Sequence, residues 1–459
     1  MTSRITNKLG ALTLSALVTA ATLTGVATTT ARAQSSNDAL LNALVRKGIL
    51  TQQDAKDLSA EVAKQNQASV LQSIAGSKND TAFVISGRIQ AQYANIITTD
   101  ADGKSDALTN NRLSRAFLRR VYLGVKANLG TNWSANVNYD FADGTFDKAF
   151  IEWAGKIYDA PFSFDIGLRK VNFAYEEYTS SANLKAIERS GLTRYFVEDA
   201  NGRRLGAGSY RIGIFADYNP AAFAGKAEGF FAGAAITNAD RQSNANLATN
   251  LAAVSTQDNT VSNQPAAWLN AGYSLKTADV TCLFGVAGAY LPRMGGMRSS
   301  NGANNPGQGI TQGDIYADVT AGAFNFVAEY LVAKVDKGAA TASNTVAGFT
   351  TTDATVSGFW LQPSVKLGKK WELVARYSLT NTGDRGIRVS DGVRSALAGG
   401  GNAAKNLSEY YIGANYYIIG NDLKLQFGYV GGQTSGAITG STLDKETANG
   451  FRTQMQINF

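Results

Sequence analysis

The sequence predicts an all-β fold: a sixteen-stranded antiparallel transmembrane β-barrel with a short N-terminal periplasmic helical segment. Apolar and polar residues alternate with a period of two in about sixteen runs between residue 82 and the C-terminus, a pattern typical of strands that separate two unlike media. No apolar run of about 20 residues follows the first segment, so transmembrane helices are not expected. Tight connections alternate with long polar ones, as they do on the two sides of outer-membrane barrels.

Residues 1–33 have the pattern of a signal peptide. Arg4 and Lys8 precede an apolar stretch that begins at Leu9, and Ala31-Arg32-Ala33 supplies the small residues of a cleavage site. A short membrane anchor is the alternative interpretation, but Thr and Ser interrupt the apolar stretch. The mature protein is therefore expected to leave the cytoplasm and to reside in the outer membrane of a Gram-negative-type bacterium.

Residues 34–80 change to a period of three to four, which predicts two short periplasmic helices. Leu40, Leu41, Leu44 and Val45 form an apolar stripe, and Thr51–Asp54 resembles a capping box that opens the second helix. The stripe is too thin to fold alone. We expect the segment to pack against itself in an oligomer, as a coiled coil, or against a periplasmic surface such as peptidoglycan. A partly ordered tether is the alternative.

Residues 81–459 are predicted to form the barrel. The alternating runs begin near Ala82, Arg112, Asn132, Thr145, Ala160, Ala207, Lys226, Gln264, Ala278, Gln312, Phe324, Ala354, Lys369, Ala404, Asp422 and Glu446. The last run, Gly450–Phe459, carries apolar residues on one face and polar residues on the other. Its expected partner is the first run, Phe83–Tyr93, because a barrel closes when its first and last strands pair.

The connections support the barrel. Tight joints are expected at Gly130-Thr131, Tyr158-Asp159, Gly368 and Gly420-Asn421, and most of the joints between them are long and rich in Asn, Ser, Thr, Ala and Gly. Asp143-Gly144 is an exception because it is short. A secreted sandwich has no reason to alternate its connections in this way, so the pattern favours a membrane barrel embedded in a lipid bilayer.

Composition narrows the possible functions. The chain has 459 residues, a formal net charge of +7, no His and a single Cys. Without His, a His-based catalytic triad and an HExxH zinc site are excluded, so no enzyme activity, metal site or cofactor is expected. The positive charge is spread along the chain, which argues against a nucleic-acid partner and weakly for anionic solutes.

A barrel of sixteen strands encloses a water-filled lumen, so residues on the polar face become candidates for contact with solutes. The basic residues with inward parity are Arg88, Arg120, Lys126, Lys148, Arg169, Arg211, Lys366, Arg376, Lys424 and Arg452. The acidic ones are Asp140, Glu152, Asp165, Asp217, Glu329 and Glu372. The basic excess fits selective anion binding, but a weakly selective pore whose charges pair with each other is equally compatible.

The connection 171–206 differs from the others because it carries aromatic and charged residues. It contains a helix-like piece, Asn183 to Ser190, and long loops with packing residues are usually held in place. We expect it to fold inward and constrict the channel, which would bring Lys185, Arg189 and Arg194 near the axis. An extracellular lid is the alternative.

Several motifs resemble the phosphate-selective porin O/P family. The clearest are Asp165–Phe173, Glu176-Glu177, Thr179–Leu184, Ile187–Ser190 and Arg203–Gly206, together with Leu118–Lys126 and the turn Lys47–Thr51. The resemblance implies a homotrimeric sixteen-stranded porin whose third loop folds into the lumen beside an Arg-lined anion path. Asn172 stands where the family usually carries Pro, and Tyr122 stands where it often has another Arg.

We therefore expect an outer-membrane porin that forms a water-filled channel for passive diffusion of small hydrophilic solutes, with a preference for anions such as phosphate. The expected solute path comprises Arg88, Arg120, Lys126, Arg169, Lys185, Arg189, Arg194 and Arg211. A non-selective general porin is one alternative. Another is a structural protein that links the outer membrane to the cell wall through its N-terminal helices.

Overall fold

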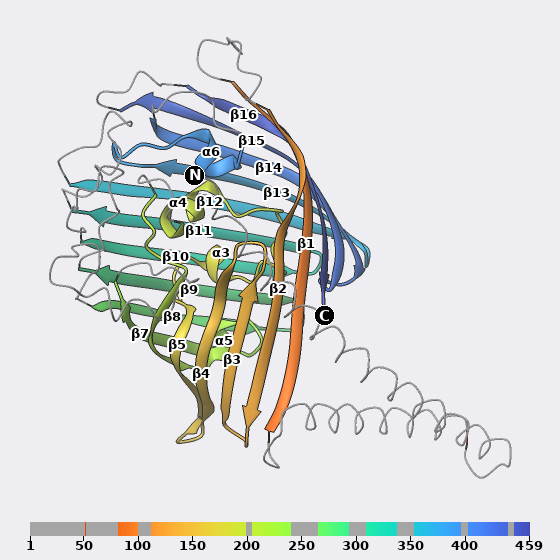
Figure 1. Cartoon of the computed structure of the whole chain (residues 1–459), viewed down its shortest axis with the longest axis vertical. Coiled ribbons are helices and arrows are strands. Elements are labelled where there is room, and N and C mark those ends of the chain that lie inside the picture. Colours follow the sequence, from red (N-terminus) through yellow and green to blue (C-terminus); the bar gives the residue numbers. More distant parts are fainter. Residues whose placement is uncertain are drawn as a thin grey trace, which may run out of the picture. The chain divides into compact units, whose positions relative to one another are not determined.

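Sixteen strands close into a single barrel in the computed structural model of the chain (Figure 1). The structure describes residues 51, 81–99, 112–198, 204–239, 265–292, 309–336, 353–395, 403–438 and 445–459. Each strand neighbours the strands before and after it in sequence, and β1 pairs with β16. The predicted signal peptide and all of the predicted helical segment except Thr51 lie outside the described residues.

The strands vary in length. They are β1 (Thr81–Thr99), β2 (Arg112–Leu129), β3 (Trp133–Asp140), β4 (Thr145–Ile157), β5 (Ala160–Lys170), β6 (Tyr210–Tyr218), β7 (Gly229–Asn238), β8 (Pro265–Lys276), β9 (Val280–Leu291), β10 (Ile310–Ala321), β11 (Phe324–Val335), β12 (Ala354–Leu367), β13 (Trp371–Asn381), β14 (Ala404–Ile419), β15 (Leu423–Ala437) and β16 (Thr447–Asn458). Every predicted run corresponds to one of these strands, which begins within three residues of the predicted start. The sixteen-stranded barrel is thus confirmed.

The predicted tight turns have the backbone geometry that hairpins need. Tyr158 and Asp159, between β4 and β5, both have positive φ angles, at 50° and 65°. Two successive positive φ angles are the signature of a two-residue hairpin whose twist matches that of its strands. Gly368 and Gly420 occupy the same left-handed region at two other tight turns, where glycine carries no steric penalty.

The barrel closes through antiparallel pairing of β1 with β16, in a register that runs from Arg88 opposite Asn458 to Thr99 opposite Thr447. Gly87 lies beside the last residue: its N–H donates to the Phe459 carbonyl at 2.8 Å, and a Cβ at Gly87 would collide with the Phe459 ring. The predicted pairing of the first and last strands is confirmed.

On the closing strands the apolar side chains are exposed and the polar side chains are buried, which is the reverse of the arrangement in a soluble protein. Met455 is 51% exposed and Phe451 is 62% exposed on the outer face, whereas Gln454 and Gln456 on the inner face are almost fully buried. Inner Gln side chains bond to each other across the seam, for example Gln90 to Gln456 at 2.6 Å. An apolar exterior around a buried polar interior is the arrangement expected of a barrel in hydrocarbon.

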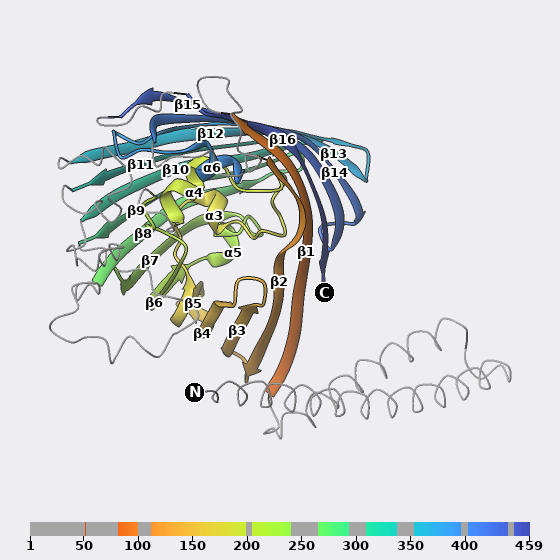
Figure 2. The same ribbon diagram turned by 45° about the horizontal axis from the view of Figure 1, so that its top comes forward.

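Four short helices accompany the strands: α3 (Tyr175–Tyr178), α4 (Gly191–Val197), α5 (Pro220–Phe223) and α6 (Val389–Val393). Figures 1 and 2 both place α3, α4 and α6 within the ring of strands. No helix among the described residues is long and apolar enough to cross a membrane. Because α3, α4 and α6 lie within the ring of strands, the connections that contain them enter the lumen.

The connection 171–206 is attached to the inner wall by ion pairs and hydrogen bonds. Lys185 Nζ lies 2.8 Å from Glu372 Oε1 on β13, and Arg376 on β13 pairs with Glu176 at 2.7 Å. Lys424 on β15 donates to the carbonyl of Leu184 at 2.9 Å. These contacts join the loop to the β12–β15 side of the barrel.

The helix-like piece predicted at Asn183 to Ser190 is wrong, because this stretch contains no helix and α3 and α4 lie on either side of it. Wall side chains bind the backbone carbonyls that a helix would use internally. Gln426 donates to the Lys185 carbonyl at 3.1 Å, and Arg376 donates to the Glu188 carbonyl at 2.8 Å. The wall therefore holds the segment in a series of turns and bends, and the helix begins only after Ser190, whose Oγ accepts from Thr193 N.

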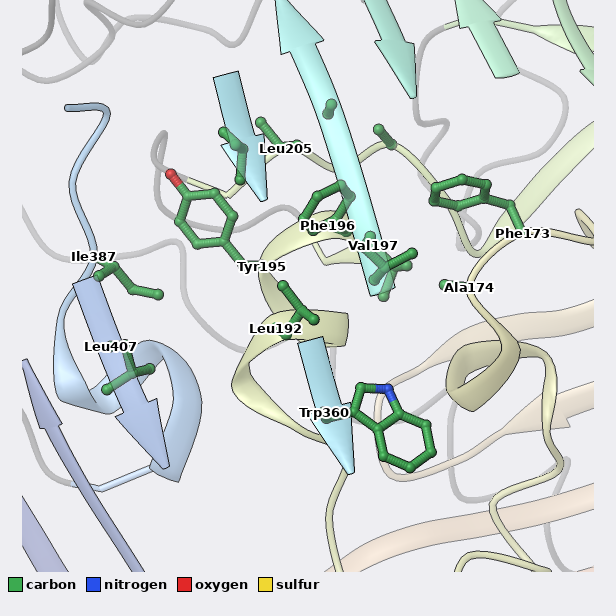
Figure 3. Packing of buried hydrophobic residues seen from close by; sticks show 14 of the residues in the cluster. Phe173, Ala174, Leu192, Tyr195, Phe196, Val197, Leu205, Trp360, Ile387 and Leu407 are labelled. Carbon is green, nitrogen blue, oxygen red and sulfur yellow. The ribbon is translucent and has the colours of Figure 1, made fainter. Parts of the chain in front are cut away.

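A second connection also enters the lumen and packs on the first. Figure 3 shows α4 residues such as Leu192 and Tyr195 between Trp360 of β12 and the pair Ile387 and Leu407. All five side chains are buried. This apolar cluster, which includes α6, locks the two connections together inside the barrel.

The orientation of the wall can be tested with Ile315, which is 55% exposed on the outer face of β10. Ile315→Lys is expected to lower the free energy of unfolding by about 2–4 kcal/mol, because it places a charge against hydrocarbon. Asn136→Lys on the inner face of β3 should cost much less, since a lumen-facing charge stays hydrated. Denaturant titrations in lipid vesicles, followed by Trp fluorescence, measure both. Equal losses would contradict the inside-out arrangement.

Candidate functional site

A cavity of about 500 Å³ lies between the wall formed by β1–β6 and the connection 171–206. Its basic lining residues are Arg88, Arg119, Arg120, Lys148, Lys170, Arg189, Arg194, Arg204 and Arg394. Its acidic lining residues are Asp140, Asp143, Asp147, Glu177 and Glu198. The loop contacts the wall on both sides, for example at Glu372 on β13 and at Arg88 on β1. The cavity that remains on the β1–β6 side has a lining with a basic excess.

Another hollow, of about 700 Å³, lies on the outer face of the barrel over β7–β12. Its lining is apolar and aromatic, including Tyr273, Phe284 and Tyr330, which are 44–48% exposed. Outward aromatic rings suit contact with hydrocarbon. This hollow is therefore not a candidate for contact with hydrophilic solutes.

The structure brings four of the eight predicted path residues together in the cavity: Arg88, Arg120, Arg189 and Arg194. The first two extend from the wall strands β1 and β2, and the last two from the connection 171–206. The cavity is thus lined by arginines from two independent parts of the fold.

The other four predicted residues do not line this cavity. Lys126 pairs with Glu152 at 3.0 Å, and Lys185 binds Glu372 on the far wall. Both charges are neutralised by a carboxylate. They support the lumen wall or the loop rather than facing the cavity.

Arg169 and Arg211 are also engaged elsewhere. Arg169 forms ion pairs with Asp165 and, at 2.8 Å, with Asp217. Arg211 donates to the carbonyls of Ala239 at 2.6 Å and Gly206 at 2.5 Å. Both side chains are buried, so they fix the segments around β5 and β6.

Two of the three arginines that the wall strands contribute to the cavity, Arg88 and Arg120, retain uncompensated charge. Arg88 donates to neutral oxygens, those of Ser181 at 2.6 Å, Ser180 at 3.2 Å and Asn458 at 2.8 Å. Arg120 donates to the Gln90 side chain at 2.8 Å. Within the described part of the chain, neither has a carboxylate at ion-pair distance, whereas an anion could accept from both.

The loop side of the cavity is held by buried carboxylates. Glu188 pairs with Arg119 at 2.8 Å and with Arg394 at 3.1 Å. Burial alone would raise the pKa of Glu188, but the charges of Arg119, Arg394 and Arg120 hold it well below its usual range. Glu188 therefore stays ionised and bridges β2, the loop 171–206 and the segment after α6.

Glu177 has a similar role nearer to β5. It pairs with Arg189 and with Lys170, each at 2.9 Å. Burial would raise its pKa, but Arg189 and Lys170 lower it. Glu177 thus compensates part of the charge of Arg189 within the loop itself. Arg88 and Arg120 therefore contribute more to the net positive charge of the cavity.

Sequence reasoning missed Arg119 and Arg394. Strict alternation assigns Arg119 to the lipid face, yet it lines the cavity beside Arg120. The cost of an Arg in hydrocarbon was a signal that could have reassigned it. Arg394 follows α6, in a connection whose entry into the lumen no sequence pattern indicates.

Tyr122, where the resembled family often has an Arg, also lines the cavity. The Arg88 guanidinium lies 5.4 Å from the centre of its ring. The ring therefore contributes a cation–π contact to Arg88 instead of a charge of its own.

Three similar solved structures are the anion-selective porin from Comamonas acidovorans (11% identity, 83% of this chain and 100% of that one, TM-score 0.48), OmpT of Vibrio cholerae (12%, 83% and 98%, 0.47) and the channel DcaP of Acinetobacter baumannii (14%, 83% and 99%, 0.45). A search of curated proteins finds no match.

The family model for phosphate-selective porin O and P matches residues 83–459, which is the whole barrel apart from its first two residues. The matched region includes all three wall arginines of the cavity and the complete inserted loop. The chain therefore belongs to the phosphate-selective porin O and P family and is a bacterial outer-membrane porin, a water-filled channel for small hydrophilic solutes with a preference for anions such as phosphate.

Proposed function

We propose that solutes cross the barrel through the cavity on the β1–β6 side and that Arg88 and Arg120 provide its anion preference. The observation that carries this proposal is that both guanidinium groups face the cavity and bond only to neutral oxygens among the described residues. A hydrated anion can exchange water for their N–H groups. Binding of this kind raises the local concentration of anions.

Passage requires that the anion also leave. Acidic residues such as Asp140 and Asp147 share the cavity, and the carboxylates of Glu177 and Glu198 neutralise part of the loop's positive charge. The mixed lining keeps the site from holding an anion tightly. Conduction requires a site that selects anions but binds them weakly enough to release them.

The connection 171–206 acts in this proposal as the constriction. It is bound to β13 and β15 and leaves a cavity on the β1–β6 side, where Glu188 anchors it to β2 through Arg119. The segment after α6 adds a second anchor through Arg394. Two connections together set the cross-section of the path.

Further parts of the organisation are proposals from the sequence: a signal peptide at residues 1–33, a periplasmic helical segment at 34–80 with peptidoglycan as a candidate partner, and assembly into a homotrimer. The family and the barrel indicate a channel rather than an enzyme, and we propose that transport uses no cofactor. Small anions such as phosphate are the proposed cargo.

Arg120→Gln tests the path. Removing one uncompensated charge from the cavity should lower the anion-to-cation permeability ratio, by about fivefold if the charge acts at close range in water. The measurement is the reversal potential in planar bilayers with asymmetric KCl. Lys126→Gln is the matched control, because Lys126 lies outside the cavity and is neutralised by Glu152. Equal effects of the two variants would exclude Arg120 from the path.

Glu188→Gln tests the constriction. Loss of the carboxylate removes both the Arg119 and the Arg394 bridge, so the loop should fluctuate and the open-channel current noise should rise at neutral pH. Because the folded pKa of Glu188 is lowered, the anchor is fully present above the unfolded value of about 4.3 and is lost only as the pH falls below it.

The wild-type channel should therefore be equally quiet at pH 7 and pH 5.5 and become noisy only in stronger acid. Single-channel recordings across this range provide the measurement. A quiet Glu188→Gln channel with unchanged conductance would show that this carboxylate does not hold the constriction.

A further inference from the structure

The wall of the cavity interrupts its inward and outward alternation twice, and each interruption brings a charge inside. On β2, Leu118 is 58% exposed on the outer face, and the next two residues, Arg119 and Arg120, both line the cavity. An unbroken alternation would have left only one of them there. The wall thereby gains a positive charge.

The second interruption is a bulge on β4. Asn138 of β3 pairs with Lys148, but the next residue, Tyr139, pairs with Phe146, so Asp147 is the extra residue. Asp147 and Lys148 both line the cavity. Bulges commonly re-aim a side chain beside a functional site, and this one adds a negative charge to a cavity in an anion channel.

The wall carboxylates of the cavity are not consumed by ion pairs. Asp140 accepts from the backbone N–H groups of Val121 at 3.1 Å and Ala142 at 3.0 Å, and Asp147 accepts from the Asn138 side chain at 3.3 Å. Across the described segments, neither has a Lys or Arg at ion-pair distance. Both therefore present negative charge to the cavity, as Arg88 and Arg120 present positive charge.

Strand order separates Arg88 and Arg120 from the two wall carboxylates, although Lys148 also lines the cavity beside Asp147 on β4. The uncompensated arginines lie on β1 and β2, and the carboxylates lie on β3 and β4. Tyr122 lies between them: it is opposite Asp140 in the strand register, and its ring lies under Arg88. Neighbouring strands are about 4.8 Å apart, so the two signs are separated by the width of a small molecule.

We infer that the cavity binds small zwitterions that carry an oxyanion at one end and a primary ammonium group at the other. The oxyanion accepts hydrogen bonds from Arg88 and Arg120, and the ammonium group donates to Asp140 and Asp147. The inference rests on the proposed function, because it places the oxyanion on the same arginines. A simple anion is not attracted by the two carboxylates, whereas a zwitterion can bind the arginines and the carboxylates at the same time.

The test compares 2-aminoethylphosphonate with ethylphosphonate as blockers of the KCl current through the full chain in planar bilayers. The two compounds differ in the ammonium group, and ethylphosphonate has the greater net negative charge. We expect 2-aminoethylphosphonate to reach half-block at a concentration roughly threefold to tenfold lower, the effect of one partly hydrated ion pair. Equal block, or stronger block by ethylphosphonate, would overturn the inference.

Asp147→Asn keeps the size of the side chain and an acceptor for Asn138. It should remove most of the advantage of 2-aminoethylphosphonate without weakening block by ethylphosphonate. Asp143→Asn, in the exposed turn that also lines the cavity, gives a second variant with a smaller loss in the same direction. Asp279→Asn, in the turn before β9, is the matched control and should behave as wild type.

Reversal potentials from the same membranes separate the two proposals. If anion preference over K⁺ persists while the two phosphonates block alike, the zwitterion site is wrong and the anion path stands. If the anion preference itself is absent, the proposed path fails. An equal weakening of both compounds in Asp147→Asn would show that Asp147 supports the wall rather than the ammonium group, and this would also overturn the inference.

Discussion

The structure depends on one constraint: in hydrocarbon, every backbone N–H and C=O group needs a partner within the protein. The pairing of β1 with β16 meets this constraint, because it leaves the sheet without an edge. Once the backbone is satisfied by neighbouring strands, the inward side chains are free for other contacts. The polar ones bond to each other and to the inserted connections, which explains why inner residues such as Gln456 are buried although they are polar.

The position of the path follows from how the wall distributes its charges. Residues on β11–β15, such as Arg376 and Lys424, are committed to the backbone and carboxylates of the loop 171–206. On β1 and β2, Arg88 and Arg120 line the cavity, and Arg88 also donates to Ser180 and Ser181 of the loop. Carboxylates and backbone groups of the loop thus occupy the basic side chains on β13 and β15, whereas Arg88 and Arg120 on β1 and β2 have no carboxylate partner among the described residues. The selectivity of the channel therefore originates in an asymmetry of contacts.

Most of the fold was predictable from the sequence, because a period of two and the turn residues act locally. Strand number, closure and the tight turn at Tyr158-Asp159 needed no long-range information. Alternation could assign Arg169 and Arg211 to the inner face, but it could not show that buried partners neutralise or bind them. It also failed at Arg119 and Asp147, where the wall departs from strict alternation. It failed again in the non-helical stretch after Asn183, where distant wall residues determine the backbone conformation.

The seam between β1 and β16 has a consequence for biogenesis. Its paired residues, such as Arg88 and Asn458, are separated by almost the entire barrel sequence. The barrel can therefore close only when the final strand pairs with the first. Until then the first strand exposes unpaired amides, and the chain cannot enter the bilayer piece by piece as a helical membrane protein does. This architecture therefore requires that the incomplete sheet be kept from pairing with other chains until the last strand is in place.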